Sequence, residues 1–492
     1  MNKTSPLINV LIGIRTILLA NGFSKFLLLA IEFFIAYSLG AAFFGLYAIT
    51  QSVIALTSVI CLMGINYGII QYLAIYEEKN DLMSQRQVIL QALTFLLGIG
   101  LCGAGLLYLL KDYLVLNLFK KEALLPLFTL AVFIIPIDTV NHGLGAIFRG
   151  LRLYKSAMLS TDLIRNITLS LGLPVLIFLD CFTLHNVLYI YMLGSSLGAL
   201  YGLQLLYRQK RIGLPFQFDT TVFRSLFGFS SLLFIFHILQ ILSSRLLILG
   251  AGVFLSSAET GILGVGIRLT LFITFFQTAV GSTVQTEFSR FQDKKDYDGQ
   301  LALFQNVTRG LFCVAAAVSL LFLTAPNYIL SFIGEDYAGY GWVIWPLLLA
   351  TAYNVVTGPI GQALVANHKQ KELVIIAALD LLMTVLIILP TMSVFGFEGG
   401  IIAQAAALTC LVTYRLYICH KLIRIHPFTK SYLVLSILFA GCIVIGVSLN
   451  ILNILPPFGA ILVTLMIYFS ALFILIFKNK DMQEQLRAIL KF

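Results

Sequence analysis

The sequence predicts an all-α integral membrane protein of about fourteen transmembrane helices. We expect two pseudo-symmetric six-helix lobes followed by two C-terminal helices, with both chain ends in the cytoplasm. Three observations support this fold class. The 492 residues are 59% hydrophobic and only 11% charged, whereas an average soluble domain is about 45–50% apolar and about 25% charged. Apolar runs recur at the length of a helical span, about 20 residues. Lys and Arg residues lie mainly in the short breaks between these runs.

The same composition excludes several protein classes. A chain with so few charges does not cover a water-facing surface, so a soluble enzyme, a disordered protein and a fibrous repeat are excluded. The net charge of +10 is spread along the chain and forms no single patch, which argues against a nucleic-acid partner. The seven cysteines show no metal-binding spacing, so we expect no metal and no cofactor. No outer loop exceeds about 16 residues by the span assignment that follows, which leaves no room for a catalytic domain and predicts that the protein is not an enzyme.

The spans follow from apolar runs bounded by charged residues, Gly or Pro. They are predicted at 10–38, 46–74, 88–110, 123–148, 157–179, 186–207, 226–251, 261–285, 300–324, 341–365, 373–394, 399–419, 431–452 and 457–477. An even number of spans places both ends of the chain on one side. We expect the first span to remain as an anchor, because no clear signal-peptidase site follows it.

The distribution of Lys and Arg predicts which side that is. With cytoplasmic ends, 22 of the 32 Lys and Arg residues fall in inside segments. Only Lys111, Lys120 and Lys121 fall outside, and the other seven lie within spans. This bias agrees with the positive-inside rule and supports both the orientation and the span count.

An internal repeat is indicated by a constant shift of 216 residues. The shift superimposes Gly45 on Gly261 and Pro174 on Pro390 in separate regions. It relates spans of equal orientation, so the repeat is parallel, and transporters of this kind hold their substrate between the repeats. The predicted domains are an N-terminal lobe (1–210), a C-terminal lobe (211–425), and helices 13 and 14 with a cytoplasmic tail (426–492).

Charged residues inside spans are costly and indicate function. Lys25 and Glu32 lie seven residues apart and share a helix face. Either both residues support packing, or Lys25 binds an anion while Glu32 modulates the Lys25 site or binds a coupling cation. Asp138 and His142 form either a proton relay or a satisfied polar pair. Arg149 continues their stripe, and the simpler interpretation is that it anchors at the cytoplasmic interface.

The remaining intramembrane charges favour an anionic cargo. Asp162 and Arg165 are expected to pair locally, three residues apart. Arg245 and Arg268 have no carboxylate at helical spacing, so they either pair across helices or face a wet cationic cavity. Asp380 is a further polar candidate. Seven basic residues stand against four acidic ones in the spans, which is a mild cationic bias.

Six segments carry a family resemblance. They are SLGAAFFGLYA (38–48), GINYGIIQYLA (64–74), FRGLRLY (148–154), FSRFQDKKDYDGQLALF (288–304), FIGEDYAGYGWVIWPLL (332–348) and FGFEGGIIAQAAA (395–407). Their order and spacing over some 400 residues resemble the polysaccharide (O-antigen or exopolysaccharide) repeat-unit flippases of the MOP superfamily, which also holds MATE exporters and lipid II flippases. The resemblance implies alternating access, a central cationic cavity and a polyprenyl-diphosphate-linked oligosaccharide as cargo.

One site residue comes from the resemblance. Lys25, in GFSK, occupies the place of a basic residue in the lipid II branch. Leu19 and Phe26 depart from that branch, which has charged residues at both places, and these departures weigh against lipid II as cargo. The resemblance also implies a bacterial cytoplasmic (inner) membrane.

Two functions remain for the experiments to separate. The first is a flippase for lipid-linked oligosaccharide in cell-surface polysaccharide biosynthesis, with Lys25, Arg245 and Arg268 contacting the diphosphate. Its expected partners are membrane lipids, a polysaccharide polymerase and assembly proteins, and the expected state is a monomer. The alternative is a cation-coupled, MATE-like multidrug exporter. Glu32, Asp138, His142 and Asp380 are the residues expected to serve coupling or to line the cavity.

Overall fold

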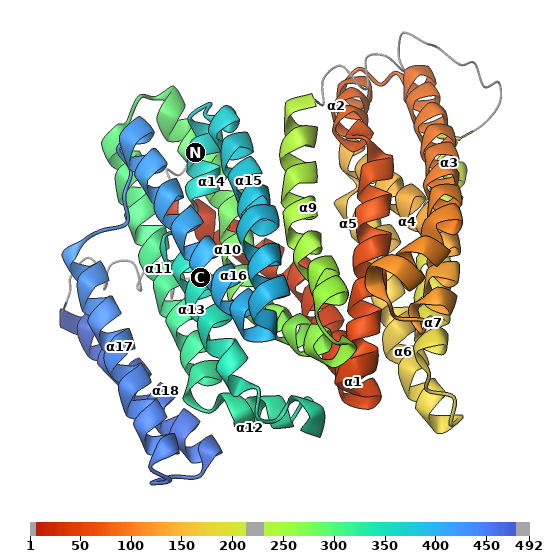
Figure 1. The fold of residues 1–492 in the computed structure, drawn as a ribbon. Coiled ribbons are helices and arrows are strands. Elements are labelled where there is room, and N and C mark those ends of the chain that lie inside the picture. Colours follow the sequence, from red (N-terminus) through yellow and green to blue (C-terminus); the bar gives the residue numbers. More distant parts are fainter. Residues whose placement is uncertain (1–5, 213–230, 479–492) are drawn as a thin grey trace. The chain divides into compact units, whose positions relative to one another are not determined.

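The computed structural model describes residues 6–212 and 231–478, and every regular element in these ranges is helical (Figure 1). Contacts divide the chain into two compact units. The first unit is Ser24–Gly261, and the second is Ile262–Phe492 together with Met1–Phe23. The lobe boundaries expected at 210 and 425 stay a prediction. The start of the span expected at 226 and most of the expected cytoplasmic tail lie outside the described residues.

The first unit is organised around one central helix. Its elements are α1 (Pro6–Leu62, of which Ser24 onward belongs to this unit), α2 (Ile65–Glu78), α3 (Leu82–Tyr113), η1 (Leu114–Phe119), α4 (Leu124–Gly150), α5 (Tyr154–Met158), η2 (Leu159–Leu163), α6 (Ile164–Phe178), α7 (Leu184–Arg208) and α9 (Ser231–Phe254). Helix α4 packs against α2, α3, α5 and α7. Leu96, Leu144, Phe148 and Leu206 belong to the buried core between these helices.

Glycines set the close approach of helices in this unit. A Cβ on Gly143 would lie 2.2 Å from Leu96 of α3, and one on Gly198 of α7 would lie 2.3 Å from the carbonyl oxygen of Ser160. Between helices in lipid, association depends on van der Waals packing, and small residues allow backbones to approach. Gly143 therefore allows α4 to lie close to α3, and Gly198 allows α7 to lie close to η2.

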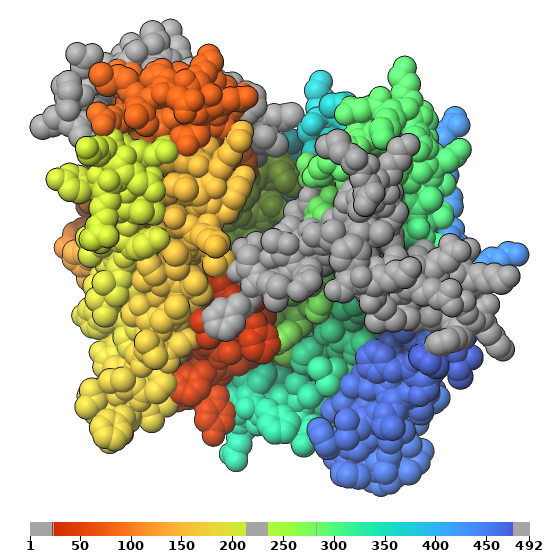
Figure 2. Space-filling model, turned by 180° about the vertical axis from the view of Figure 1, so that it is seen from behind, coloured from red at the N-terminus to blue at the C-terminus, as the bar shows by residue number. Residues whose placement is uncertain are grey.

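The second unit has α11 at the centre of its packing. Its elements are α10 (Ser257–Asp293, most of which belongs here), α11 (Tyr297–Thr324), α12 (Pro326–Ser331), η3 (Glu335–Tyr337), η4 (Gly341–Val343), α13 (Ile344–Val356), α14 (Ile360–Ala366), α15 (Gln370–Met383), η5 (Thr384–Ile388), α16 (Leu389–Ile423), α17 (Lys430–Ile451) and α18 (Pro457–Lys478). Helix α11 packs against α13, α17 and α18. The last two form one block, blue in Figure 2. The hydroxyl of Tyr468 in α18 donates to the Cys313 carbonyl of α11 at 3.1 Å and holds this block in place.

Eleven helical segments among the described residues are long and apolar enough to cross a membrane. The segment Ser24–Leu62 has 39 residues, or about 58 Å of helix, against a hydrocarbon core of about 30 Å. Gly40 breaks it with a positive φ of 77°. Gly396, with φ 65°, likewise breaks the 54-residue segment Gln370–Ile423.

Splitting these two segments at their glycines, and adding the 25-residue α7, gives fourteen, the number predicted from the sequence. Two of the predicted spans are interrupted. The expected helix 46–74 is interrupted, because α1 ends at Leu62 and α2 begins at Ile65 after a left-handed Met63 and Gly64. The expected helix 341–365 is interrupted as well, because α13 ends at Val356 and α14 begins at Ile360 after Gly358, whose φ is 89°.

Candidate functional site

The face that α1 presents is determined by a buried polar contact. The side-chain amide of Asn166 in α6 donates to the carbonyl oxygen of Ser24 at 3.1 Å and to its hydroxyl at 3.2 Å. Ser24 is therefore buried against α6. Lys25, about 100° further round the helix, is exposed, as is its neighbour Phe26.

Glu32 lies on the same face of α1 as Lys25, as the spacing predicts. No break separates the two residues, since the only non-helical backbone in α1 is at Gly40. Glu32 is half-buried, whereas Lys25 is exposed. The ammonium group is thus accessible to a ligand, and a carboxylate lies two turns further along the same face.

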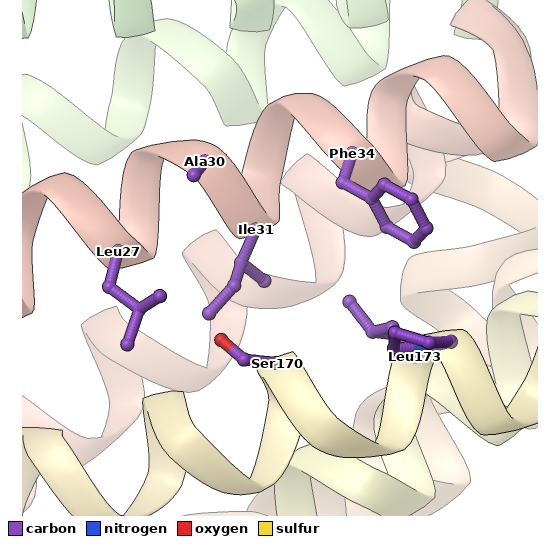
Figure 3. A pocket seen from close by; sticks show the side chains of 7 residues that line it. Leu27, Ala30, Ile31, Phe34, Ser170 and Leu173 are labelled. Carbon is purple, nitrogen blue, oxygen red and sulfur yellow. The ribbon is translucent and has the colours of Figure 1, made fainter.

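An apolar cavity of about 180 Å³ lies on the opposite face of α1 (Figure 3). It is lined by Leu27, Ala30, Ile31 and Phe34 of α1 and by Ser170, Leu173 and Pro174 of α6. The lining contains no charged side chain, so the cavity suits hydrocarbon and does not suit a phosphate group. Sequence reasoning did not identify this cavity, because its lining looks like any buried helix face.

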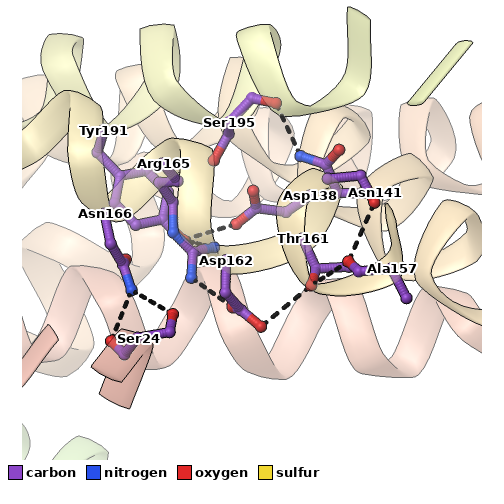
Figure 4. A network of polar contacts seen from close by, with 11 residues as sticks. Ser24, Asp138, Asn141, Ala157, Thr161, Asp162, Arg165, Asn166, Tyr191 and Ser195 are labelled. Atoms are coloured by element: carbon purple, nitrogen blue, oxygen red, sulfur yellow. Dashed lines mark hydrogen bonds and ion pairs between the residues drawn. The ribbon is translucent and has the colours of Figure 1, made fainter. Parts of the chain in front are cut away.

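A polar network joins α4, η2, α6 and α7 within the first unit (Figure 4). The hydroxyl of Tyr191 donates to Oδ2 of Asp138 at 2.9 Å. Nη1 of Arg165 donates to the same hydroxyl at 3.3 Å, and its guanidinium carbon lies 5.1 Å from the centre of the Tyr191 ring. Nη2 of Arg165 forms an ion pair with Asp162 at 2.9 Å. The side-chain amide of Asn141 donates to the Ser195 carbonyl at 2.8 Å.

The network decides some of the expectations from sequence. The local pairing of Asp162 with Arg165 is confirmed. Asp138 is buried, and its hydrogen-bond donor is Tyr191, a residue that the sequence did not single out. His142, one turn from Asp138 on α4, has an exposed side chain. Tyr191 was missed because one tyrosine within an apolar run carries no signal of its partner.

The other predicted site residues are divided between the two units. Arg245 is half-buried on α9 and belongs to the same unit as Lys25. Arg268 is half-buried on α10 and belongs to the second unit, where its Nη1 donates to the Gly264 carbonyl of its own helix at 3.1 Å. Asp380, on α15 of the second unit, interacts electrostatically with Arg415 of α16.

The described side chains offer binding groups rather than a metal centre. Among them, no group of three or more His, Cys, Asp or Glu residues is placed to hold a metal ion. The first unit instead combines an exposed cation on α1, a buried carboxylate on α4 and an apolar cavity between α1 and α6.

Comparison with solved structures identifies the fold. An inward closed structure of the lipid II flippase MurJ superposes with a TM-score of 0.69 at 15% identity, covering 94% of this chain and 99% of its own. An inward-facing multidrug resistance transporter of the MATE family gives 0.67 at 13% identity, covering 82% and 94%. A MOP superfamily transporter from Pyrococcus furiosus gives 0.57 at 11% identity, covering 85% and 95%. The fold is therefore that of MOP superfamily transporters.

Sequence comparison identifies the family. No curated protein sequence matches the chain significantly. The model of the family described as "polysaccharide biosynthesis protein" matches residues 36–342, which is more than half of the 492 residues. This multi-pass membrane protein belongs to the polysaccharide biosynthesis protein family.

Proposed function

We propose that the protein is a flippase that moves a polyprenyl-diphosphate-linked oligosaccharide repeat unit across the cytoplasmic membrane of a bacterium by alternating access. The product would feed cell-surface polysaccharide synthesis, such as that of O-antigen. The observation that carries the proposal is Lys25. It is an exposed cation in a membrane-spanning helix. The Ser24–Asn166 contact fixes the rotation of α1 about its axis, so that the face with Lys25 stays exposed.

The chemistry of this cargo fits the side chains. A charge within a span costs about 2.5–3.5 kcal/mol on insertion scales. The presence of Lys25 in such a helix therefore indicates a functional role. A diphosphate is an anion that an ammonium or guanidinium group binds strongly. We expect Arg245 and Arg268 to contribute to the same diphosphate during transport. The sugars require a wet path, and the lipid tail can remain in hydrocarbon.

The test is made in the host that carries the gene. Deletion should cause one complete lipid-linked oligosaccharide to accumulate on the cytoplasmic face. Mass spectrometry identifies the accumulated unit, and an impermeant sugar-modifying probe reports its leaflet. The Lys25→Ala, Arg268→Ala double variant should fail to restore export, although it is inserted and folded. Lys79→Ala, at an exposed lysine after α2, should restore export fully.

Normal export by the double variant would overturn the assignment of the diphosphate site. Unchanged glycolipids after gene deletion would overturn the flippase itself. The proposed partners, a polymerase and assembly proteins, and the monomeric state belong to the same proposal.

The alternative function is export of cationic compounds coupled to a cation. The buried Asp138 carboxylate and the fold shared with a MATE transporter favour it. Dye efflux from cells that express the protein separates the two functions. Efflux that is lost in Glu32→Gln or Asp138→Asn would favour the exporter, and efflux equal to that of cells without the protein would exclude it.

A further inference from the structure

The cytoplasmic half of α4 exposes two basic residues from an otherwise buried stretch. Residues 143–148 and Gly150 are all buried, whereas His142 and Arg149 are exposed. The two lie seven residues apart, which places them on one face of the helix. Asp138 begins the same stripe, one turn before His142, and is buried.

This stripe lies on the side of α4 opposite an exposed aromatic residue. Phe133, the exposed aromatic residue of the other half of the helix, lies nine residues before His142, or two and a half turns. The two side chains therefore point in opposite directions. Helices α2, α3, α5 and α7 pack around α4 and leave His142 and Arg149 exposed.

Two further helices contribute a tyrosine and a histidine ring near the stripe of His142 and Arg149. Tyr67 of α2 and His237 of α9 meet edge to face, with their ring centres 6.2 Å apart. Arg149 interacts electrostatically with Tyr67, and His142 with His237. Three helices, far apart in sequence, thus supply one set of side chains, which we call the inner basic cluster: His142, Arg149 and His237, with Tyr67 beside them.

The nearby carboxylates already have partners. Asp162 attracts Arg149 electrostatically, but its ion pair at 2.9 Å is with Arg165. Asp138 accepts from Tyr191 at 2.9 Å. Arg165 lies beside both carboxylates from α6 and pairs with Asp162. Asp138 and Asp162 also attract His142, so the cluster offers a ligand the guanidinium charge of Arg149 and the N–H donors of the two histidines.

We propose that the inner basic cluster binds the phosphate groups of the lipid-linked cargo within the cytoplasmic half of the first unit, as a subsite separate from Lys25. This inference rests on the proposed flippase function and extends it to residues that were not expected to contact the cargo. Arg149 supplies a planar, bidentate donor to phosphate oxygens, and the two histidines supply single N–H donors.

The experiment measures binding of a short polyprenyl diphosphate to the purified full-length protein. Farnesyl diphosphate, farnesol and inorganic pyrophosphate are titrated separately by isothermal calorimetry in detergent. We expect wild type to prefer farnesyl diphosphate. Arg149→Gln should weaken its binding about tenfold or more, since it removes a charge-assisted contact. The His142→Ala, His237→Ala double variant should weaken binding by a smaller factor.

The matched control is Arg152→Gln, the same change of charge three residues away on an exposed arginine. It should bind like wild type, and all variants should share the wild-type thermal unfolding midpoint. Unchanged affinity in Arg149→Gln would overturn the subsite and leave the proposed function intact. Equal affinity for inorganic pyrophosphate would reassign the cluster to soluble diphosphates. A wild-type protein that does not bind farnesyl diphosphate would overturn the diphosphate cargo and the subsite together.

Discussion

At the scale of single residues, Lys121 explains one exception to the charge bias. It is one of only three basic residues expected outside, yet it is half-buried. Its ammonium donates to the carbonyl oxygens of Gly252, Leu255 at 3.0 Å and Phe119 at 3.5 Å. Gly252 lies in the last turn of α9, where carbonyls lack helical partners and a cation complements the helix dipole. Burial lowers the pKa of Lys121, and Glu259 opposes this effect.

Replacing this lysine should therefore loosen the end of α9. Lys121→Met keeps the length and apolar stem but leaves the carbonyl groups without their charged donor. We expect a loss of about 1–3 kcal/mol in the free energy of unfolding, measured by denaturant titration in detergent. Lys120→Met is the matched control, because Lys120 is adjacent and exposed. Equal stability of the two variants would contradict the capping role.

Residues also show how far sequence reasoning extends. The Asp162–Arg165 ion pair was predictable, because helical spacing alone brings residues three apart together. The Tyr191–Asp138 hydrogen bond joins residues 53 apart, and only the packing of α7 on α4 creates it. Long-range polar partners therefore required the structure, while local ones did not.

At the scale of elements, α1 and α10 meet through the two glycines that the sequence repeat pairs. A Cβ on Gly45 would lie 1.9 Å from the Ser257 carbonyl oxygen, and one on Gly261 would lie 1.9 Å from that of Ala41. Ala41 and Ser257 are themselves separated by the repeat shift of 216 residues. The contact is thus reciprocal, because each glycine lies against a carbonyl oxygen of the other segment.

This close approach predicts a strict requirement for glycine. In Gly45→Ala or Gly261→Ala the added methyl group would overlap a backbone carbonyl oxygen, so the two helices must move apart. We expect each to cost about 1–3 kcal/mol, seen as a lower thermal unfolding midpoint in detergent. Gly105→Ala is the control, since Gly105 is helical and nothing lies within 4 Å of its added Cβ. It should be neutral or stabilising. A midpoint for Gly45→Ala equal to that of Gly105→Ala would contradict this packing.

The helices themselves were predicted well, but their joints were not. Apolar runs set the length and number of spans, because each must cross the same hydrocarbon thickness. They do not show whether two successive spans are joined by a loop or by one kinked helix. At Gly40 the helix continues to either side of a single left-handed residue, so the expected loop of several residues is one kinked position.

At the scale of the whole molecule, hydropathy and charge were enough for the fold class, and the resemblance of six segments was enough for the family, but neither identified the cargo. The sequence fragments that resemble the flippase family extend over most of the residues that the family model matches. The sequence did not show that Lys25 and Arg149 are exposed, because exposure depends on packing. Lys25 was identified from sequence, whereas Arg149 was interpreted as an anchor.

The orientation of the molecule can be tested through a native cysteine. Cys181 is exposed between α6 and α7, a connection expected on the outside. Cys102 and Cys410 are also exposed, but they lie within membrane-spanning segments, where hydrocarbon disfavours the reactive thiolate. Cys61, Cys419 and Cys442 are buried, and Cys313 is half-buried within the membrane-spanning segment Tyr297–Thr324. An impermeant maleimide should therefore label intact cells at Cys181, and the label should disappear in Cys181→Ser.

An inside control completes this test. Lys79→Cys, made in the Cys181→Ser background, places an exposed thiol after α2, in a connection expected on the cytoplasmic side. It should react only after the membrane is permeabilised. The opposite pattern, with Lys79→Cys labelled in intact cells and Cys181 protected, would invert the molecule. The inner basic cluster would then lie in the outer half of the membrane, and a lipid-linked cargo would meet it on release rather than on loading.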